Sequence, residues 1–369
     1  MLTRRFTTTG GAERYAAEIA SRLARRCELH VFAQEIGVEV PGVTFHRLAR
    51  ISEKPRYLNQ IHFARQAAGL RERFDVVHTH DRVNDFDVMT IHSPTFKGGY
   101  LGGRSGLPYW WRRATRGFSP RVAYYLWQEA RQFRRVRGRR FIAVSRHVMR
   151  DALAQYPVEE GDFDFAYPGV NLEHFAPATP AARAVARARF GLRDGELVVC
   201  FVGSEFERKG LGTLVEAMAL LEGEPVRALV AGAGDPRPFS HERIRFAGLV
   251  KDVQEIYAAG DLYALPTTSD PSPMAPLEAM ASGLPVIVSS AEVTGVAEHV
   301  RHDEAVLLQD PRSAAELAQA IRRLQDPGAR AEYARRGLRL AQGITWEETA
   351  RRTFESYERS RAMRLERAA

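Results

Sequence analysis

Two carboxylates set around the start of one helix are the most informative chemical feature of this sequence. Asp270 lies in a Thr/Ser/Asp/Pro loop, and Glu278 follows within the helix that we expect to end at Gly283. Carboxylate oxygens accept hydrogen bonds from hydroxyl groups, and the free N–H groups of a helix's first turn favour phosphate oxygens. We therefore expect Asp270 and Glu278 to face one cavity that suits a sugar nucleotide.

Spacing alone leaves a purely structural explanation open. An Asp before a helix is commonly its cap, and a Glu in the first turn commonly complements the helix dipole.

The elements around the two acids form a strand, loop, helix and strand. Residues 261–266 are an apolar run typical of a buried strand, and Pro276 suits a first helical turn. Gly283 is expected to stop the helix before the next strand, residues 286–289. In such units the ligand crevice lies outside the carboxyl ends of the strands.

Two other loops offer groups that bind phosphate. Arg208 and Lys209 lie between an expected strand and helix, where two adjacent cations can neutralise a diphosphate without a metal. Ordinary solvation of the helix start is the alternative. Gly10 and Gly11 precede the expected helix 12–25, so the backbone can approach an anion at that helix's N-terminus.

Histidines end two expected strands of the first half. His92 follows the apolar run 88–91, and His78 and His80 follow the run that begins at Phe74. A histidine at a strand end is often a satisfied structural residue. We favour a functional role for His92 over a structural one, and the reverse for His80.

Composition places the chain among globular proteins. Its 369 residues suffice for two domains, with 45% hydrophobic and 27% charged residues. The sequence contains no run of 18 apolar residues and no apolar signal region at its start, so we expect a cytoplasmic protein. Cys27 and Cys200 are far apart and lack metal-site spacing, so no metal or redox site is expected.

The net charge of +8 is concentrated in one segment. Residues 101–150 contain thirteen arginines and a single acid, Glu129. Aromatic residues beside this charge favour contact with an anionic membrane surface over nucleic-acid binding or a merely solvated face. The membrane-contact candidates are Trp110, Trp111, Arg112, Arg113 and Arg116.

Strand-like runs alternate with helical patterns in both halves, which indicates an α/β protein with two parallel sheets. We expect domains at 1–175 and 176–345, followed by a separate helix at 346–369. Only six residues precede the Gly-rich turn 7–11, so the first strand is either a stub or incomplete.

The block D-P-S-P-M-A-P-L-E-A-M-A-S-G-L-P-V is similar to the acidic motif of retaining glycosyltransferase family 4, commonly E-P-F-G-L-V-P-L-E-A-M-A-C-G-L-P-V. Two departures are Asp270, one methylene shorter than Glu, and Pro273, which lacks an amide donor. The R-K-G ending at Gly210 and the basic aromatic segment resemble the lipopolysaccharide core glucosyltransferase I subgroup.

The resemblance implies a GT-B fold. Two Rossmann-like domains would face each other across a cleft, the first binding acceptor and the second nucleotide sugar, with a C-terminal helix crossing back to the N-terminal domain. It implies a catalytic set of His92, Asp270, Arg208 and Lys209. The implied donor-binding residues are Gly10, Gly11, Arg208, Lys209, Asp270, Met274, Ala275 and Glu278. His80 and Arg14 are expected on the acceptor side.

The activity implied is transfer of a hexose, with retention, from a nucleoside diphosphate sugar to a hydroxyl of a lipid-linked or cell-envelope glycan. UDP is favoured as the nucleotide, and no metal or other cofactor is expected. We expect the protein at the inner face of the plasma membrane, without nucleic-acid partners. The alternatives are a sugar-nucleotide epimerase on the same fold and a non-catalytic, membrane-peripheral protein that binds nucleotide sugars.

Overall fold

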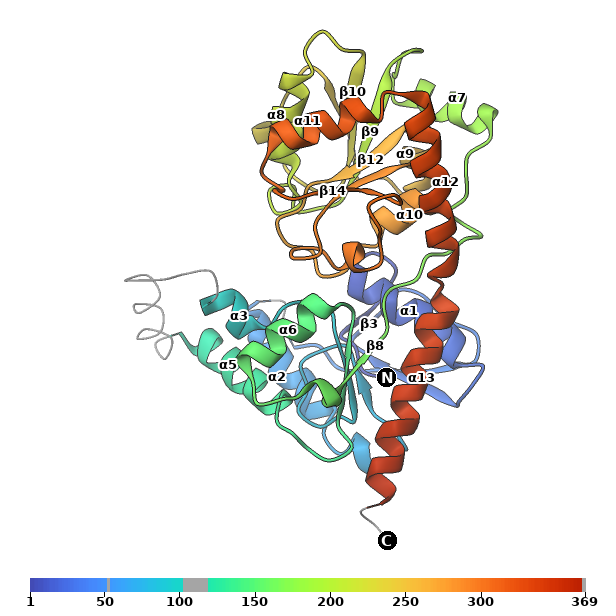
Figure 1. Cartoon of the computed structure of the whole chain (residues 1–369). Helices are drawn as coiled ribbons and strands as arrows, with labels where there is room; N and C mark the ends of the chain where they lie inside the picture. The colour runs from blue at the N-terminus through green and yellow to red at the C-terminus, as the bar shows by residue number, and fades with distance from the viewer. Residues whose placement is uncertain (52–53, 102–118, 367–369) are drawn as a thin grey trace. The chain divides into compact units, whose positions relative to one another are not determined.

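The computed structural model describes residues 1–51, 54–101 and 119–366 (Figure 1). The chain divides into two compact units. The first comprises Met1–Tyr167 together with Trp346–Ala369, and the second comprises Pro168–Thr345.

The second unit contains a six-stranded parallel sheet in the order β11-β10-β9-β12-β13-β14. The order reverses direction between β9 and β12, which is where open sheets of this kind bind ligands. The strands are β9 (Leu197–Val202), β10 (Val226–Ala231), β11 (Ile244–Gly248), β12 (Leu262–Leu265), β13 (Val286–Ser289) and β14 (Val306–Leu308).

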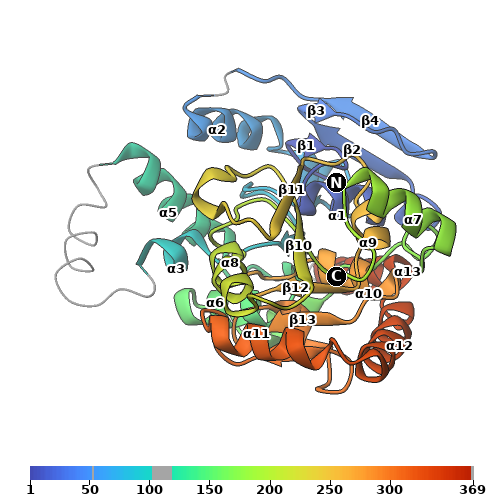
Figure 2. The same ribbon diagram turned by 90° about the horizontal axis from the view of Figure 1, so that it is seen from above.

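Helices cover both faces of this sheet (Figure 2). Contacts join α8 to α11, α10 to α12 and α7 to α9. The helical segments are α7 (Pro180–Arg189), α8 (Leu211–Leu220), η4 (Arg237–Phe239), α9 (Gln254–Ala259), α10 (Ala275–Ala281), η5 (Gly295–Glu298), α11 (Ala314–Arg323) and α12 (Pro327–Gly343).

The first unit has a parallel sheet whose central strand is very short. Leu2 forms bridges with Phe32 and Thr79, and so joins the pair β2-β4 to the group β5-β6-β7-β8. The Leu2 amide donates to the His78 carbonyl at 2.7 Å. Leu2 therefore lies in this sheet between the β2-β4 pair and the β5-β6-β7-β8 group.

The strands of the first unit are β1 (Arg5–Phe6), β2 (Leu29–Ala33), β3 (Glu35–Ile36), β4 (Val43–Arg47), β5 (His78–Thr79), β6 (Val88–Ile91), β7 (Arg140–Ala143) and β8 (Phe163–Phe165). Its helical segments are α1 (Gly11–Leu23), α2 (Arg56–Gln66), η1 (Leu70–Glu72), α3 (Phe96–Leu101), α5 (Pro120–Gln132), α6 (Arg146–Gln155), η3 (Glu160–Asp162) and α13 (Trp346–Leu365).

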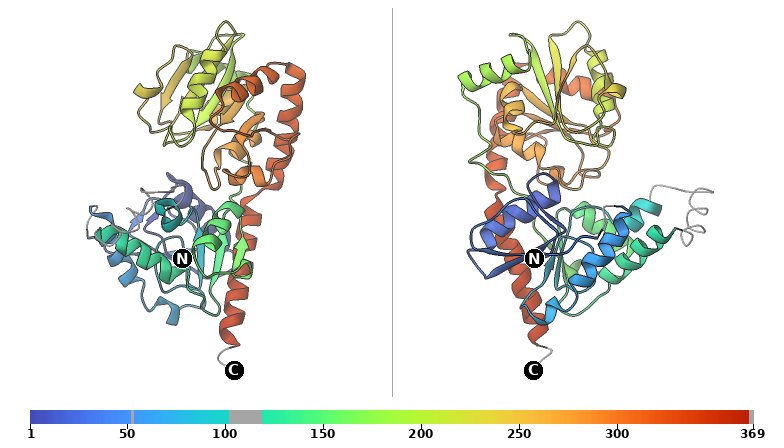
Figure 3. Two further views of the ribbon diagram at one scale, coloured as in Figure 1. Left: turned by 60° about the vertical axis from the view of Figure 1, so that its left-hand side comes forward. Right: turned by 180° about the vertical axis from the view of Figure 1, so that it is seen from behind.

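The last helix, α13, packs against the first unit (Figure 3). Trp346 is fully buried and meets the Tyr15 ring of α1 edge-on, with centroids 5.5 Å apart. The Tyr357 hydroxyl lies 2.6 Å from His78 Nδ1. These contacts confirm the expectation that the C-terminal helix returns to the N-terminal domain.

Candidate functional site

The loop after β9 and the loop after β12 bring two cations to one carboxylate. Lys209 Nζ donates to Asp270 Oδ2 at 2.7 Å, and Arg208 Nη1 lies 3.9 Å from the same oxygen. Arg208 is also paired with Glu205, through a 2.7 Å hydrogen bond from Nε. The structure therefore brings Arg208 and Lys209 of one loop next to Asp270 of another.

Close backbone contacts hold the cationic loop in place. Gly210 has a left-handed conformation, with φ of 82°, and a Cβ there would collide with the Pro266 carbonyl. The Arg208 carbonyl accepts hydrogen bonds from the Thr268 amide and the Thr267 hydroxyl, each at 3.1 Å. The loop is thus fixed against the carboxyl end of β12.

Asp270 is held by its backbone as well as by Lys209. Its amide donates to the Val293 carbonyl at 2.8 Å, and its carbonyl accepts from Gly295 N at 3.2 Å. The carboxylate takes one of the three N–H donors of Lys209. A bound phosphate could use the others without breaking the pair.

The helix α10 begins and ends where the sequence predicted, with Pro276 in its first turn and Gly283 just beyond Ser282. Met274 is the N-cap residue and makes no side-chain cap hydrogen bond, and Ala275 is the first helical residue. Asp270 is therefore not the cap of this helix. This removes the helix-cap explanation for that acid.

Glu278 is buried within α10 and accepts a 3.1 Å hydrogen bond from the Tyr257 hydroxyl. Burial and the adjacent Glu278 charge raise the Tyr257 pKa, so the hydroxyl stays protonated and can donate. Burial, Asp270 and Glu278 likewise raise the pKa of Tyr263. The two acids thus have different partners, Lys209 and Tyr257, and Tyr263 experiences both charges.

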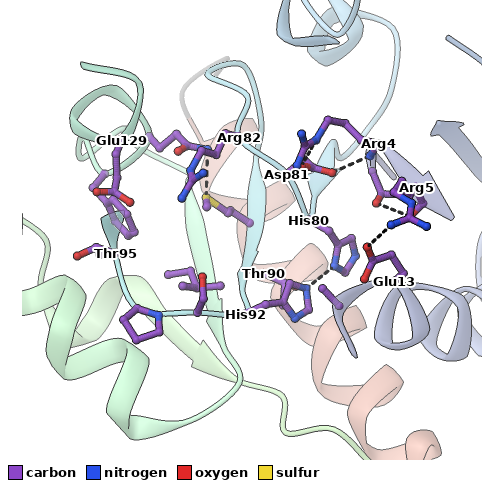
Figure 4. A pocket seen from close by; sticks show the side chains of 18 residues that line it. Arg4, Arg5, Glu13, His80, Asp81, Arg82, Thr90, His92, Thr95 and Glu129 are labelled. Carbon is purple, nitrogen blue, oxygen red and sulfur yellow. Dashed lines mark hydrogen bonds and ion pairs between the residues drawn. The ribbon is translucent and has the colours of Figure 1, made fainter. Parts of the chain in front are cut away.

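A cavity of about 250 Å³ lies in the first unit beyond the carboxyl ends of β5 and β6, beside the start of α1 (Figure 4). Its lining is mostly polar. It includes Arg4, Arg5, Glu13, His80, Asp81, Arg82, Thr90, His92, Thr95 and Glu129.

His80 and His92 meet at this cavity. Their Nδ1 and Nε2 atoms lie 2.9 Å apart, with the rings stacked at 5.2 Å. Burial lowers the His92 pKa to about 4, an effect that the Asp81 charge partly offsets. Burial, together with the neighbouring His78 and His92, lowers the His80 pKa well below its usual value. At neutral pH both rings are uncharged and share one hydrogen bond.

His78 has a structural environment instead. It is fully buried, with Nε2 at 2.7 Å from the Thr90 hydroxyl and Nδ1 at 2.6 Å from Tyr357 Oη.

The Glu13 carboxylate lies at the N-terminus of α1, where an anionic ligand would otherwise bind. Gly10 is the extended N-cap residue, and the Glu13 carboxylate folds over it so closely that a Cβ on Gly10 would collide with it. Gly11 opens the helix, and Arg14 is half-buried one turn further on. A donor phosphate at this terminus would compete with Glu13.

Sequence reasoning did not single out Arg4, Asp81, Arg82 or the site role of Glu129. Asp81 accepts hydrogen bonds from Arg4 N at 2.6 Å and Arg4 Nε at 2.7 Å. Asp81 and Arg82 follow His80 directly, so their place at a strand end could have identified them. No local signal brings Arg4 or Glu129 to this cavity.

The membrane-contact candidates Trp110, Trp111, Arg112, Arg113 and Arg116 lie outside the described residues. Among the residues that are described, no helix is both long and apolar enough to cross a membrane. The same part of the chain contains no cluster of three or more His, Cys, Asp or Glu side chains that could hold a metal ion.

Two protein families match the chain. The family described as Glycosyltransferase Family 4 matches residues 9–174, and the one described as Glycosyl transferases group 1 matches residues 196–326.

Curated relatives match the chain over different lengths. A D-inositol 3-phosphate glycosyltransferase of Nocardia farcinica is 33% identical over 241 residues, which cover 59% of this chain and 52% of the relative. The chain thus spans about half the length of that relative. A probable transglycosylase of Burkholderia thailandensis is 31% identical over 287 residues, covering 76% of this chain and 74% of the relative.

Solved structures share the fold over nearly the whole chain. WaaG, a glycosyltransferase involved in lipopolysaccharide biosynthesis, has a TM-score of 0.80 at 21% identity, covering 95% of this chain and 97% of its own. Anabaena HepE in complex with UDP-glucose has a TM-score of 0.72 at 17% identity, covering 96% and 97%. At these identities the likeness shows the fold alone.

Proposed function

The chain belongs to glycosyltransferase family 4 and has the GT-B fold, and on this premise we propose that it transfers a hexose from a nucleoside diphosphate sugar, with UDP favoured. The proposed acceptor is a hydroxyl of a lipid-linked or cell-envelope glycan. One observation carries the proposal: Lys209, Arg208 and Asp270 meet beyond the carboxyl ends of β9 and β12. Two cations can bind the phosphate oxygens of a sugar nucleotide, and the carboxylate of Asp270 can accept hydrogen bonds from its sugar hydroxyl groups.

The second unit would bind the donor. Lys209 and Arg208 stabilise the negative charge that grows on the diphosphate as the bond to the anomeric carbon breaks. Glu278 accepts hydrogen bonds from the ribose hydroxyls, and Asp270 orients the transferred sugar. Met274 and Ala275 lie at the start of α10, between Asp270 and Glu278 in the sequence.

The first unit would supply uncharged and backbone donors. His92 is neutral at physiological pH and can donate to or accept from a sugar hydroxyl. The Gly10 and Gly11 amides favour phosphate oxygens at the N-terminus of α1. Arg14 and His80 are proposed on the acceptor side.

We propose transfer with retention at the anomeric carbon and without a metal. The bond from that carbon to the phosphate oxygen breaks, the bond to the acceptor oxygen forms on the same face, and the acceptor proton passes to the departing phosphate. Names of similar proteins support a sugar nucleotide donor, since HepE is described with UDP-glucose. The name of WaaG supports a cell-envelope acceptor.

Slow hydrolysis of the donor without acceptor tests this function. UDP-, GDP- and ADP-glucose would be compared, with magnesium and with EDTA, and the first released glucose would be assigned by NMR. The proposal predicts preference for UDP-glucose, equal rates in EDTA and initial release of the α-anomer. A β-anomer would refute retention. Binding without any release would favour a non-catalytic nucleotide-sugar-binding protein.

Peripheral contact with the inner face of the plasma membrane is a further part of this proposal. Beyond the candidates at 110–116, α5 presents Trp127, which is 50% exposed, with the Arg131 guanidinium 4.8 Å from its ring centroid. Such aromatic and cationic pairs suit an anionic lipid surface. Replacing Arg112, Arg113 and Arg116 by Ser should weaken sedimentation with anionic vesicles and leave neutral vesicles unaffected. Unchanged partitioning would reject membrane contact.

A further inference from the structure

We propose that Tyr257 is a positioning residue for the donor: its hydroxyl holds the Glu278 carboxylate in the orientation that recognises a ribose, and so sets a preference for ribonucleotides over 2′-deoxyribonucleotides. The inference rests on the proposed role of Glu278 and adds a second residue to it. Tyr257 acts through Glu278 and not on the nucleotide directly.

The Tyr257 hydroxyl lies against the first turn of α10. It is 3.1 Å from Glu278 Oε2 and 3.3 Å from the Ala275 carbonyl oxygen. A phenol has one proton to donate, and a charged carboxylate is a stronger acceptor than a backbone carbonyl. The hydroxyl therefore donates to Glu278, beside the residue with which the helix begins.

Tyr257 is held in place by its own packing. It lies on α9 and is buried, and its ring meets the Phe175 and Tyr263 rings edge-on, with centroids 6.0 and 6.1 Å apart. Burial and the Glu278 charge raise the Tyr257 pKa, so the hydroxyl keeps its proton at neutral pH. Because a closely packed ring has little freedom to turn, the donor stays directed at Glu278.

A hydrogen bond of this kind prepares a carboxylate for a diol. It restricts rotation of the Glu278 carboxylate about its last bond, and it uses one of about four acceptor positions of that group. The hydroxyl is uncharged, so it does not neutralise Glu278 as the Lys209 cation neutralises Asp270. A carboxylate that is already oriented loses less conformational entropy when it accepts from the ribose hydroxyls.

A hydrogen bond that only joined α9 to α10 would have a different consequence. Its loss would lower the stability of the second unit and weaken the binding of every nucleotide alike. The loss of an orienting bond weakens only the contacts that Glu278 itself makes, and these include the 2′-hydroxyl of the ribose. The ratio of the affinities for UDP and 2′-deoxy-UDP therefore separates the two roles.

Calorimetric titration of UDP and 2′-deoxy-UDP into the full chain measures this ratio. Wild-type protein should bind UDP at least about tenfold more tightly, as expected for one hydrogen bond to a charged group. Tyr257→Phe keeps the ring and should lower the ratio to about threefold or less, mainly by weakening UDP. Tyr333→Phe is the matched control. It removes another hydroxyl of a buried tyrosine in the same unit, one that donates to the His302 carbonyl at 3.2 Å, and should keep the wild-type ratio.

A double variant tests whether Tyr257 acts through Glu278. In a protein that already carries Glu278→Gln, the change Tyr257→Phe should alter the ratio no further. A further change there, or an unchanged or larger ratio in Tyr257→Phe alone, would overturn the inference and leave the proposed donor intact. Equal binding of UDP and 2′-deoxy-UDP by the wild type would overturn both the inference and the contact of Glu278 with ribose. Absence of UDP binding by folded wild-type protein would count against the proposed function itself.

Discussion

At the scale of single residues, Lys209 has two tasks. One N–H holds Asp270 at 2.7 Å, and the others can stabilise a leaving diphosphate. We predict that Lys209→Ala lowers the rate of UDP release from UDP-glucose by about 100-fold or more, the effect typical of removing one donor to a developing oxyanion. Lys251→Ala, which changes an exposed lysine of the same unit, should keep the wild-type rate. A wild-type rate in Lys209→Ala would remove this residue from the mechanism.

The buried histidines make the stability of the folded protein depend on pH. Burial lowers the His92 pKa from 6.5 to about 4, so the folded state binds fewer protons than the unfolded state between these values. The contribution of neutral His92 to the free energy of unfolding is therefore fully present above pH 6.5 and is lost as the pH falls toward 4. For His92 alone we expect the free energy of unfolding to fall by about 1 kcal/mol between pH 7.5 and 5.5.

Urea unfolding at the two pH values measures this loss, and His92→Asn should show a smaller difference than the wild type. An equal difference in both proteins would mean that His92 remains accessible to protons in the folded state.

Single residues also show where sequence reasoning stops. Arg208, Lys209 and Asp270 were identified because motifs and strand ends place such side chains in a crevice. Their direct contact depends on two loops far apart in the sequence, so no local pattern reveals it. The contact of Arg4 with Asp81 was missed because the two residues are 77 positions apart in the sequence.

At the scale of elements, the loop between β9 and α8 depends on Gly210. Its left-handed conformation alone would cost a larger residue about 1–2 kcal/mol, and a Cβ would also collide with the Pro266 carbonyl. We predict that Gly210→Ala destabilises the second unit by at least about 2 kcal/mol more than Gly223→Ala. Gly223 has a similar φ of 86° but open space around it. Equal losses of unfolding free energy in the two variants, measured with urea, would show that the close approach of Gly210 to the Pro266 carbonyl does not contribute to the destabilisation.

Elements with a continuous apolar run were predicted well, and those at the sheet margins were not. The strands β12 and β13 and the stop at Gly283 follow from apolar runs and glycine chemistry. The strand Val43–Arg47 was missed because its residues are only partly buried, so no apolar run marks it. The run from Phe74 suggested a strand too early, since β5 begins at His78.

At the scale of the whole molecule, α13 makes the first unit depend on the last residues of the chain. Trp346 is fully buried against Tyr15, and replacing a buried Trp by Ala typically costs about 3–5 kcal/mol. We predict that Trp346→Ala speeds hydrogen exchange in α1 and β6, while β9 and β12 keep their protection. Leu365→Ala, at an exposed position near the end of the same helix, should leave both units unchanged. Equal acceleration in both units would contradict their independent cores.

Alternation of strand-like and helical patterns was sufficient to predict two parallel sheets, whereas the returning helix was implied by the resemblance to a family with the GT-B fold. The cavity of the first unit could not be predicted in the same way, because its lining comes from several strand ends and from α5.

We propose above that the second unit binds a nucleoside diphosphate sugar through Glu278 and the cations of the β9 loop. Calorimetric titration of UDP-glucose into wild-type protein and Glu278→Gln tests it most directly, because Gln preserves the size of the side chain and an acceptor for Tyr257. We expect measurable binding by the wild type and at least about tenfold weaker binding by the variant. Identical affinities in two folded proteins, or no binding of UDP-, GDP- or ADP-glucose by the wild type, would contradict it.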